Sequence, residues 1–166
     1  MTDSNLRSLM VKTSFEELKK EAKEFLDNNP ILVLATSGDG RVTARSMLCV
    51  HQGLTVLFET DINTTKLKQM RANPNVALCA KRVQIEGTAT IRAHPLDPSC
   101  RDFAELYKSK NPRSFNNHAH HKNQIVVEVE PHLFTFWRSA NNYRYTDVLY
   151  LKENRYEQVQ FDTSPE

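Results

Sequence analysis

The chain has 166 residues, which is enough for one domain with a substantial core and too few for two. A formal net charge of +2 argues against a nucleic-acid-binding face, which usually concentrates a larger excess of lysine and arginine. The longest apolar stretches fall far short of the roughly 20 residues that cross a bilayer, and the N-terminus shows no signal-peptide pattern. We therefore expect a single cytoplasmic domain over residues 1–166, with neither membrane nor nucleic acid as a partner.

The N-terminal part of the chain predicts one helix followed by strands. Ser14 and Glu17 form a capping box, and apolar residues recur at helical spacing up to Pro30, so a helix is predicted over about 14–28. Apolar or alternating segments joined by turn residues predict three strands, at 31–36, 41–50 and 54–60. Because short turns join these strands, we expect them to pair as an antiparallel meander.

The rest of the chain predicts short helices between further strands. A two-turn helix ends at Asn73-Pro74, a longer helix over about 97–109 begins with Asp97 as its cap, and 111–123 is a polar loop. Further strands are expected at 75–80, at 83–93, as two strands within 124–139 that break at Pro131, and as a terminal hairpin over 141–161. This pattern predicts a mainly β, α+β fold, a closed or partly closed β-barrel with peripheral helices.

The segment "FETDINTTKLKQM" at 58–70 predicts a strand end, a polar turn and the start of a basic helix. Such a turn presents free backbone N–H groups and the positive end of a helix dipole, which favour an anion. Threonine hydroxyls and Lys66 add donors, and Arg45 on a neighbouring strand could converge on the same point, which suits a phosphate monoester. The same residues also fit a simpler arrangement, in which a threonine caps the helix, Lys66 is solvated and Arg45 forms a surface ion pair.

Three segments together resemble the pyridoxamine 5'-phosphate oxidase-like family of FMN-binding split barrels: "VLATSGDGRVTARSMLCV", "LFETDINTTKLKQMRANPNVAL" and "VQIEGTATI". The shared order is a strand ending in Ala-Thr, a glycine turn, an arginine in the second strand, a third strand ending in threonine, a lysine, Asn-Pro and a strand containing glycine. The match covers about residues 30–92 and indicates a divergent member of general-stress-protein type. It implies an antiparallel split β-barrel of Greek-key type.

The resemblance implies FMN bound at a homodimer interface. Arg45 and Lys66 would hold the FMN phosphate, and Thr65 stands where the family often has an arginine. Arg82 takes the place of a glutamine that touches the flavin ring, and Trp137 resembles a tryptophan that contacts the flavin from the partner subunit, with an ordinary core tryptophan as the alternative. The segment from Arg45 to Leu48 would lie along the isoalloxazine ring, and Glu59 and Thr60 would sit beside the ring. The predicted cofactor-binding residues are Arg45, Ser46, Met47, Leu48, Glu59, Thr60, Thr65, Lys66, Arg82 and Trp137.

Departures from the family pattern lie on the substrate side. True pyridoxamine phosphate oxidases carry a lysine where this chain has Val50, an Arg-x-His pair near Tyr143 and Tyr145, and an arginine at Asp147. We therefore expect an FMN-dependent oxidoreductase that transfers hydride at flavin N5, acts on another small cytoplasmic substrate and uses a nicotinamide nucleotide or other small redox partner. No side-chain acid or base is required, so no catalytic residue is assigned. The alternative is a flavin- or haem-binding protein without turnover, active in storage, sensing or stress response.

The histidine-rich segment "NNHAHHKN" suggests a metal ligand set, because histidine is the commonest transition-metal ligand. However, no cysteine or carboxylate accompanies His118, His120 and His121 at a suitable spacing, so no metal site is predicted. Haem remains an alternative to FMN, since some relatives of this fold bind haem. The number of cysteines is three, and without CxxC spacing this predicts reduced thiols rather than disulfides.

Overall fold

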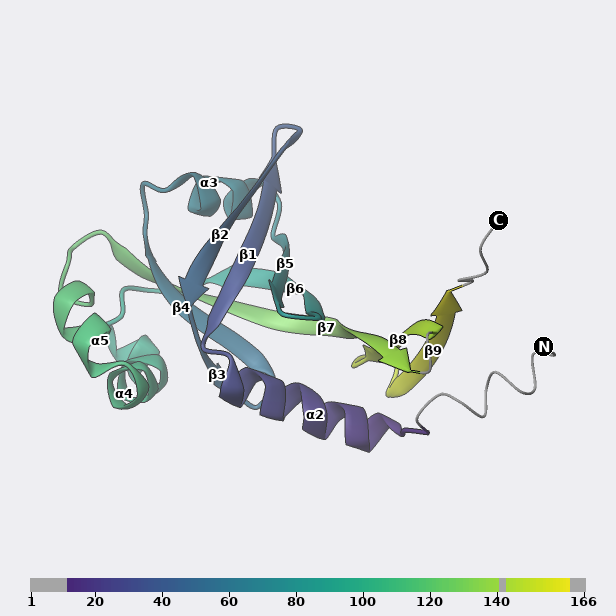
Figure 1. The fold of residues 1–166 in the computed structure, drawn as a ribbon. Coiled ribbons are helices and arrows are strands. Elements are labelled where there is room, and N and C mark those ends of the chain that lie inside the picture. Colours follow the sequence, from purple (N-terminus) through teal and green to yellow (C-terminus); the bar gives the residue numbers. More distant parts are fainter. Residues whose placement is uncertain (1–11, 141–142, 162–166) are drawn as a thin grey trace.

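Figure 1 shows the fold in a computed structural model, in which residues 12–140 and 143–161 are described. The elements in chain order are α2 (Phe15–Asn28), β1 (Ile31–Gly38), β2 (Arg41–Leu48), β3 (Val50–Gln52), β4 (Thr55–Asp61), α3 (Thr65–Ala72), β5 (Asn75–Ala80), β6 (Val83–Ile91), the 3-10 turn η1 (Pro98–Cys100), α4 (Arg101–Lys110), α5 (Pro112–His118), β7 (Gln124–Ala140), β8 (Tyr143–Tyr150) and β9 (Arg155–Phe161). Over these ranges the strands form one antiparallel sheet, in the order β2-β1-β5-β6-β7-β4-β3, with β8 paired to β7 and β9 paired to β8. The predicted fold class is confirmed. Within the same ranges, no helix has the length and apolar character needed to span a bilayer.

Strand β7 joins the parts of the sheet because it pairs with three other strands. It runs beside β6 for most of its length, while its first half also pairs with β4 and its second half with β8. The β4 and β8 branches of the sheet therefore leave β7 from its two halves, as Figure 1 shows. The prediction of two strands broken at Pro131 is wrong. The register of β6 against β7 shifts between Glu86 and Gly87, opposite Pro131, and this bulge accommodates a residue that lacks an N–H group.

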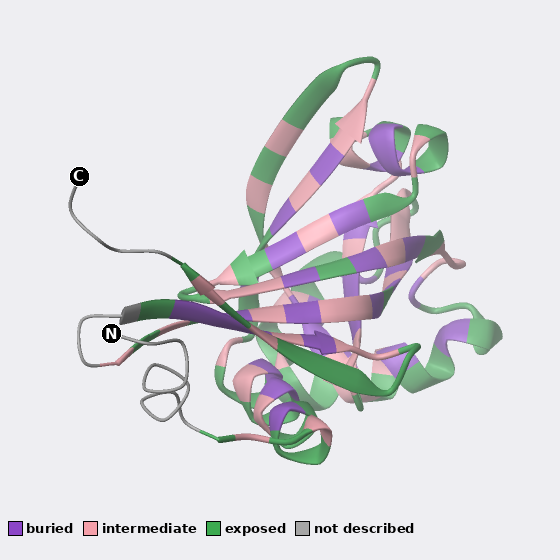
Figure 2. Ribbon diagram, turned by 90° about the vertical axis from the view of Figure 1, so that its right-hand side faces the viewer, coloured by how far each residue is buried: buried purple, intermediate pink, exposed green. Residues whose placement is uncertain are grey.

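Strand β4 is buried on both faces, which gives the molecule two apolar cores. Val56 and Phe58 point into the larger core between the sheet and α2. Leu57 points into a smaller core covered by α4 and α5. Figure 2 shows the buried bands along the central strands, whereas the hairpin that joins β1 and β2 at the top is largely exposed. Glu59, two residues beyond Leu57 on β4, therefore faces the α4–α5 side.

The helices largely follow their sequence signals, with one exception. The Ser14 hydroxyl accepts a hydrogen bond from the Glu17 N–H at 3.3 Å, which confirms the predicted N-cap of α2. The prediction of a polar loop over 111–123 is wrong, because α5 occupies much of it. Pro112 supplies a helical φ at the first position, and Phe115 becomes buried against α4, so packing offsets the polar composition.

The predicted meander is correct only for its first hairpin. Strands β1 and β2 pair throughout, but in the described part of the chain β4 pairs with β3 and β7 rather than with β2. The chain turns a corner at Cys49, whose N–H donates to the Pro30 carbonyl at 2.7 Å. This corner ends β2 and directs the following residues to the other side of the barrel. The terminal hairpin, β8 with β9, is confirmed.

Gly87 is required by the close approach of β7. A Cβ at this position would lie 2.5 Å from the Glu130 carbonyl oxygen and 2.9 Å from Val129 Cγ1. We expect Gly87→Ala to lower the free energy of unfolding by about 1–3 kcal/mol, because the backbone of β7 must move. Urea denaturation measures the change. Thr90→Ala, at an exposed position of the same strand, is the control and should change stability by less than about 0.5 kcal/mol, and an equal loss in both variants would contradict the explanation.

Candidate anion and cofactor site

The turn before α3 is held by its own polar groups. The Asn63 N–H donates to Asp61 Oδ1 at 2.7 Å, and the Thr64 hydroxyl donates to the Asp61 carbonyl at 2.8 Å. Thr64 occupies the N-cap position, but among the described residues its side chain makes no capping hydrogen bond. Thr64 therefore shapes the turn rather than capping the helix, and the first turn of α3 keeps its N–H groups for another acceptor.

Arg45 is fixed by a polar network between β1, β2 and α3. Its Nη1 donates to the Thr36 hydroxyl at 2.7 Å and to the Leu34 carbonyl at 3.2 Å, and its Nη2 donates to the Thr43 hydroxyl. Both threonine hydroxyls donate in turn to Gln69 Oε1, each at 2.7 Å. Arg45 is therefore not part of a surface ion pair. Gln69, which the sequence did not identify, links the guanidinium to α3.

Lys66 and Arg45 form a pair of half-buried cations. Burial lowers the pKa of Lys66, the Arg45 guanidinium lowers it further, and Asp61 partly opposes both effects. Burial also lowers the pKa of Arg45. Two cations that repel one another in a partly desolvated place favour the arrival of an anion, which would restore both pKa values towards their usual range.

A cavity of about 210 Å³ lies beside these cations. It is lined by the predicted residues Met47, Leu48, Glu59, Thr60 and Lys66, and by Asp61, Tyr107, Ser114, His118 and Gln124. Burial raises the pKa of Glu59 to about 7. Both carboxylate oxygens of Glu59 are buried, and neither has a hydrogen-bond partner among the described residues. The cavity therefore combines a cation with an acceptor that lacks a donor.

The wall contributed by α4 and α5 was missed by the sequence analysis. Tyr107 is buried, and its hydroxyl lies 3.1 Å from Ser114 Oγ. His118 completes this wall at the end of α5. The sequence signals for α5 were Pro112 at its first position and the apolar residues Phe115 and Ala119 at helical spacing. Contact with Glu59 could not be predicted, since it depends on how the helices pack on β4.

Some predicted residues lie outside this cavity. Arg45 is not among its lining residues, and burial followed by the Arg45 charge lowers the pKa of Lys66, which does line it. Ser46 is exposed on the outer face of β2, and Thr65 is the exposed first residue of α3. Of the β2 residues predicted to lie along the isoalloxazine ring, Met47 and Leu48 line the cavity.

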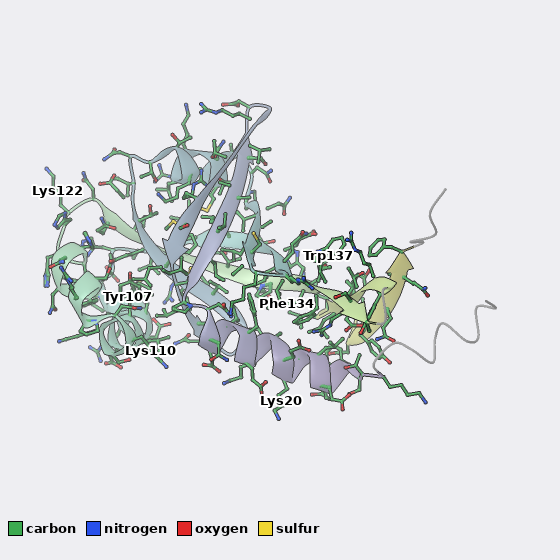
Figure 3. The ribbon with its side chains drawn as sticks, in the orientation of Figure 1. Lys20, Tyr107, Lys110, Lys122, Phe134 and Trp137 are labelled. Carbon is green, nitrogen blue, oxygen red and sulfur yellow. The ribbon has the colours of Figure 1, made fainter. Side chains whose placement is uncertain are left out.

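Arg82 and Trp137 form a second, separate cluster. The Trp137 N–H donates to the Arg82 carbonyl at 2.9 Å, and Arg82 Nη1 donates to Ser139 Oγ at 3.4 Å. Trp137 is 48% exposed and stacks on Phe161 with ring centroids 5.4 Å apart, so it is not a core tryptophan. Figure 3 shows Trp137 near β9, away from Tyr107 on α4. A hollow of about 330 Å³ is lined by Arg82, Trp137, Arg138, Ser139 and Arg144.

The histidines of the α5 region point in different directions. His118 contributes to the cavity wall, and its ring centroid lies 6.0 Å from that of His121. His120 meets the edge of Phe115, with centroids 6.2 Å apart. Across residues 12–140 and 143–161, histidine, cysteine and carboxylate side chains form no group of three or more that could hold a metal ion.

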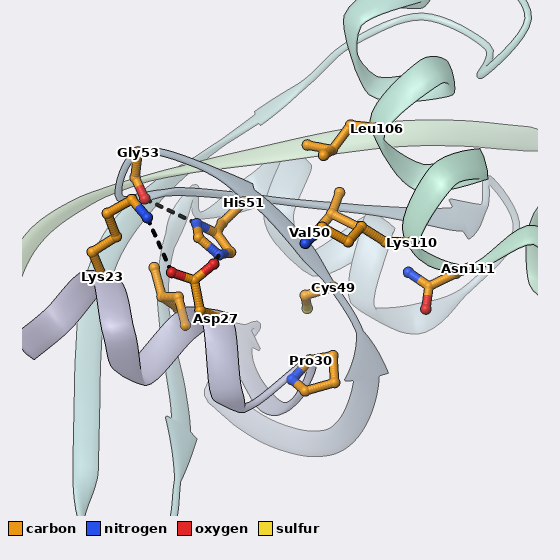
Figure 4. Close-up of a pocket in the computed structure, with 11 residues that line it drawn as sticks. Lys23, Asp27, Pro30, Cys49, Val50, His51, Gly53, Leu106, Lys110 and Asn111 are labelled. Carbon is orange, nitrogen blue, oxygen red and sulfur yellow. Dashed lines mark hydrogen bonds and ion pairs between the residues drawn. The ribbon is translucent and has the colours of Figure 1, made fainter.

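Another cavity, of about 370 Å³, lies between the end of α2, β3 and the end of α4, and is shown in Figure 4. On one side, Asp27 accepts from Lys23 Nζ at 3.0 Å and lies 3.1 Å from His51 Nε2. Val50, the position at which the resemblance places a lysine in true oxidases, also lines this cavity. Burial raises the pKa of the neighbouring Cys49 thiol to about 12, so this thiol stays protonated.

Comparison with known proteins shows the family of this chain. The sequence profile of the family described as "Pyridoxamine 5'-phosphate oxidase" matches residues 18–138, which is most of the chain. The chain belongs to the pyridoxamine 5'-phosphate oxidase family. The predicted family is therefore confirmed, and the match extends well beyond the segment 30–92 on which the resemblance rested.

Two curated relatives are similar to this member of the family. A pyridoxine/pyridoxamine 5'-phosphate oxidase of Rhodopirellula baltica is 30% identical over 120 residues, covering 68% of this chain and 51% of the relative. The chain thus spans about half the length of that oxidase. General stress protein 26 of Bacillus subtilis is 26% identical over 125 residues, covering 70% of this chain and 85% of the relative.

Solved structures share the split-barrel fold at low identity. A pyridoxamine 5'-phosphate oxidase-related, FMN-binding protein of Nostoc punctiforme has a TM-score of 0.58 and 14% identity, covering 92% of this chain and 100% of that one. HutZ of Vibrio cholerae, a haem storage protein, has a TM-score of 0.57 and 16% identity, covering 72% and 91%. At these identities the likeness concerns the fold alone.

The network around Gln69 yields a prediction about stability. Gln69→Leu would leave the buried Thr36 hydroxyl without its acceptor and loosen Arg45, so we expect the free energy of unfolding to fall by about 1–3 kcal/mol. Urea denaturation measures this. Gln52→Leu, at an exposed position of β3, should change stability by less than about 0.5 kcal/mol. Equal changes in the free energy of unfolding in the two variants would show that the network does not contribute to stability.

Proposed function

We propose that this chain binds FMN with its phosphate at Arg45 and Lys66. The observation that carries the proposal is the pair of half-buried cations at the start of α3, next to a cavity in a protein of this family. An anion at this point would interact with both cations and with the uncapped N–H groups of α3. Charge-assisted hydrogen bonds of this kind are among the stronger polar contacts in proteins.

The donors and acceptors present suit the rest of the cofactor. Beyond Lys66, the cavity offers an acceptor at Glu59 and apolar side chains at Met47 and Leu48. FMN likewise has a phosphate, then a hydroxyl-bearing chain, then an aromatic ring. The cavity thus offers a cation, an acceptor and apolar side chains, and these kinds of group correspond to those that FMN presents.

Bound FMN supplies hydride transfer at its N5 atom, and the protein supplies binding and orientation. We propose that the chain is an FMN-dependent oxidoreductase that exchanges hydride with a nicotinamide nucleotide or another small redox partner. Its substrate is not pyridoxamine phosphate. Val50 is buried in the smaller core, and Tyr145 and Asp147 are buried in β8, so these positions offer no free cation to a substrate phosphate. The side chain of Tyr143 lies outside the described residues.

The proposed dimer would bring the two clusters of predicted residues together. One cluster surrounds Lys66 and the other contains Arg82 and Trp137, and the two lie in different parts of the protomer. Two copies could complete each site by contributing one cluster each. The outer face of β1 and β2 supports such an interface, because Val33 is 37% exposed and Val42 is 70% exposed on the same sheet.

Removing the two cations tests the phosphate site. In Arg45→Ala combined with Lys66→Ala, we expect FMN affinity to fall by roughly 100-fold or more, since two charge-assisted contacts are lost. Flavin fluorescence titration measures the affinity, and circular dichroism checks the fold. Lys68→Ala, an exposed residue of the same helix, should bind FMN as the natural chain does. Unchanged affinity in the double variant would refute the site, and a haem Soret band in place of flavin absorption would favour haem as the cofactor.

Charging the outer face tests the dimer. We expect Val33→Glu to reduce the mass measured by light scattering from two subunits to one and to weaken FMN binding, because a buried unpaired carboxylate would oppose association. Leu96→Glu is the control, since Leu96 is also exposed, at 46%, but lies after β6. A mass of one subunit for the natural chain would overturn the dimer.

A further inference from the structure

The cavity between α2, β3 and α4 lies where the two apolar cores meet. Leu26 and Cys49 in its wall belong to the larger core, Val50 belongs to the smaller core, and Leu106 packs against the smaller core. Its volume of about 370 Å³ is within the range of small-molecule sites in proteins. Among the described residues, it shares no lining residue with the cavity beside Lys66. It is therefore a separate place for a ligand, with an apolar wall supplied by both cores.

The polar groups at the α2 end of this cavity already have partners. Asp27 accepts a hydrogen bond from Lys23 Nζ at 3.0 Å. The two ring nitrogens of His51 lie 3.1 Å from Asp27 Oδ1 and 2.9 Å from the Gly53 carbonyl oxygen. Figure 4 shows these contacts as dashed lines. The carboxylate of Asp27 thus compensates the Lys23 ammonium, and both nitrogens of His51 are engaged.

The polar groups at the α4 end lack such partners. Lys110 is exposed in the last turn of α4 and forms no ion pair with another described residue. Asn111 joins α4 to α5 and occupies the N-cap position of α5, but its side chain makes no capping hydrogen bond. Its Nδ2 atom is buried and has no hydrogen-bond partner among the described residues. In Figure 4 this nitrogen points toward the side on which Cys49 and Val50 lie.

These two groups define the chemistry of a ligand. A buried N–H donor without an acceptor is costly, and a ligand that supplies the acceptor recovers this cost. Because the Lys110 ammonium stands next to Asn111, the favoured acceptor is an anion, and a carboxylate has two oxygens with which to bond both groups. Besides His51, the charged side chains of the wall are the ammonium groups of Lys23 and Lys110 and the single carboxylate of Asp27, so the charge of the wall also favours an anion.

We propose that this cavity binds an aliphatic monocarboxylate, such as a medium-chain fatty acid, with its carboxylate at Lys110 and Asn111 and its hydrocarbon chain against Leu26, Val50 and Leu106. This site goes beyond the proposed function and does not depend on FMN. The hydrocarbon chain adds apolar contacts between the two cores, so binding also stabilises the fold.

The head group is tested by isothermal calorimetry of the full chain with octanoate, octanol and octylamine. We expect octanoate to bind about tenfold more tightly than octanol, because its hydrogen bonds are charge-assisted, and octylamine to bind more weakly than octanol. Octanoate should also bind more tightly than hexanoate, by roughly twofold to fourfold for each additional buried CH₂. No binding of octanoate, equal binding of octanoate and octanol, tighter binding of octylamine, or equal binding of hexanoate and octanoate would overturn the proposal.

Substitutions at the α4 end test the two predicted contacts. In Asn111→Leu we expect octanoate affinity to fall by about tenfold. The stability of the ligand-free chain should not fall, because the amide nitrogen has no described partner to lose. Lys110→Gln changes an exposed residue, so the fold is kept, and octanoate should weaken while octanol binding stays the same. Asn116→Leu, at an exposed position of α5, is the matched control. Unchanged octanoate affinity in both Asn111→Leu and Lys110→Gln would refute the site.

The place of binding is tested against the cavity beside Lys66. Octanoate should bind the chain equally well with and without saturating FMN, and should bind Arg45→Ala combined with Lys66→Ala as it binds the natural chain, since neither residue lines this cavity. Loss of octanoate binding in either comparison would assign it to the other cavity and overturn the inference. If the natural chain binds octanoate but not FMN, only the proposed function fails. If it binds FMN but not octanoate, only this inference fails.

Discussion

The close contact between Gly87 and the backbone of β7 determines where the sheet divides. Before this contact β7 pairs with β4, and after it with β8. A side chain at Gly87 would meet the Glu130 carbonyl oxygen at 2.5 Å, so any residue other than glycine would force the backbone of β7 to move. The two groups of predicted cofactor residues lie on either side of this crossing. Glu59 stands on the strand that pairs with the first half of β7, and Trp137 stands on its second half.

Within the first group, the fold holds charges that the described part of the chain neutralises only in part. Arg45 is oriented by neutral hydroxyls and an amide, so its hydrogen bonds do not cancel its charge. Burial and then the Arg45 charge lower the pKa of Lys66. The buried Glu59 carboxylate has no hydrogen-bond donor among the described residues. Such arrangements reduce stability locally and are typical of binding sites, because a complementary ligand supplies the missing partners. The same features would be difficult to explain as devices for stabilising the barrel.

The sequence predicted local features well and non-local pairing poorly. The capping signal at Ser14, the strands through β6 and the family resemblance all rest on short segments with their own turn chemistry. The pairing of β4 with β7 joins segments far apart in the chain, and α5 forms because Phe115 finds a place against α4. Consequently Lys66 and Thr60, which line the cavity, could be identified from the sequence, whereas the cavity residues Tyr107 and Ser114 and the network residue Gln69 could not. Their roles depend on packing between elements.

The departures from the oxidase pattern gain a structural explanation from the C-terminal strands. Asp147, where the resemblance places an arginine, accepts hydrogen bonds from Arg138 and Gln158, each at 2.8 Å. Arg138 also binds both carboxylate oxygens of Glu21 at 2.7 Å, which fastens α2 to β7. An arginine at 147 would face Arg138 across a buried site and break this link. Asp147 thus helps to join α2 to the sheet, so the departure from the oxidase pattern at this position follows from how this chain holds its first helix.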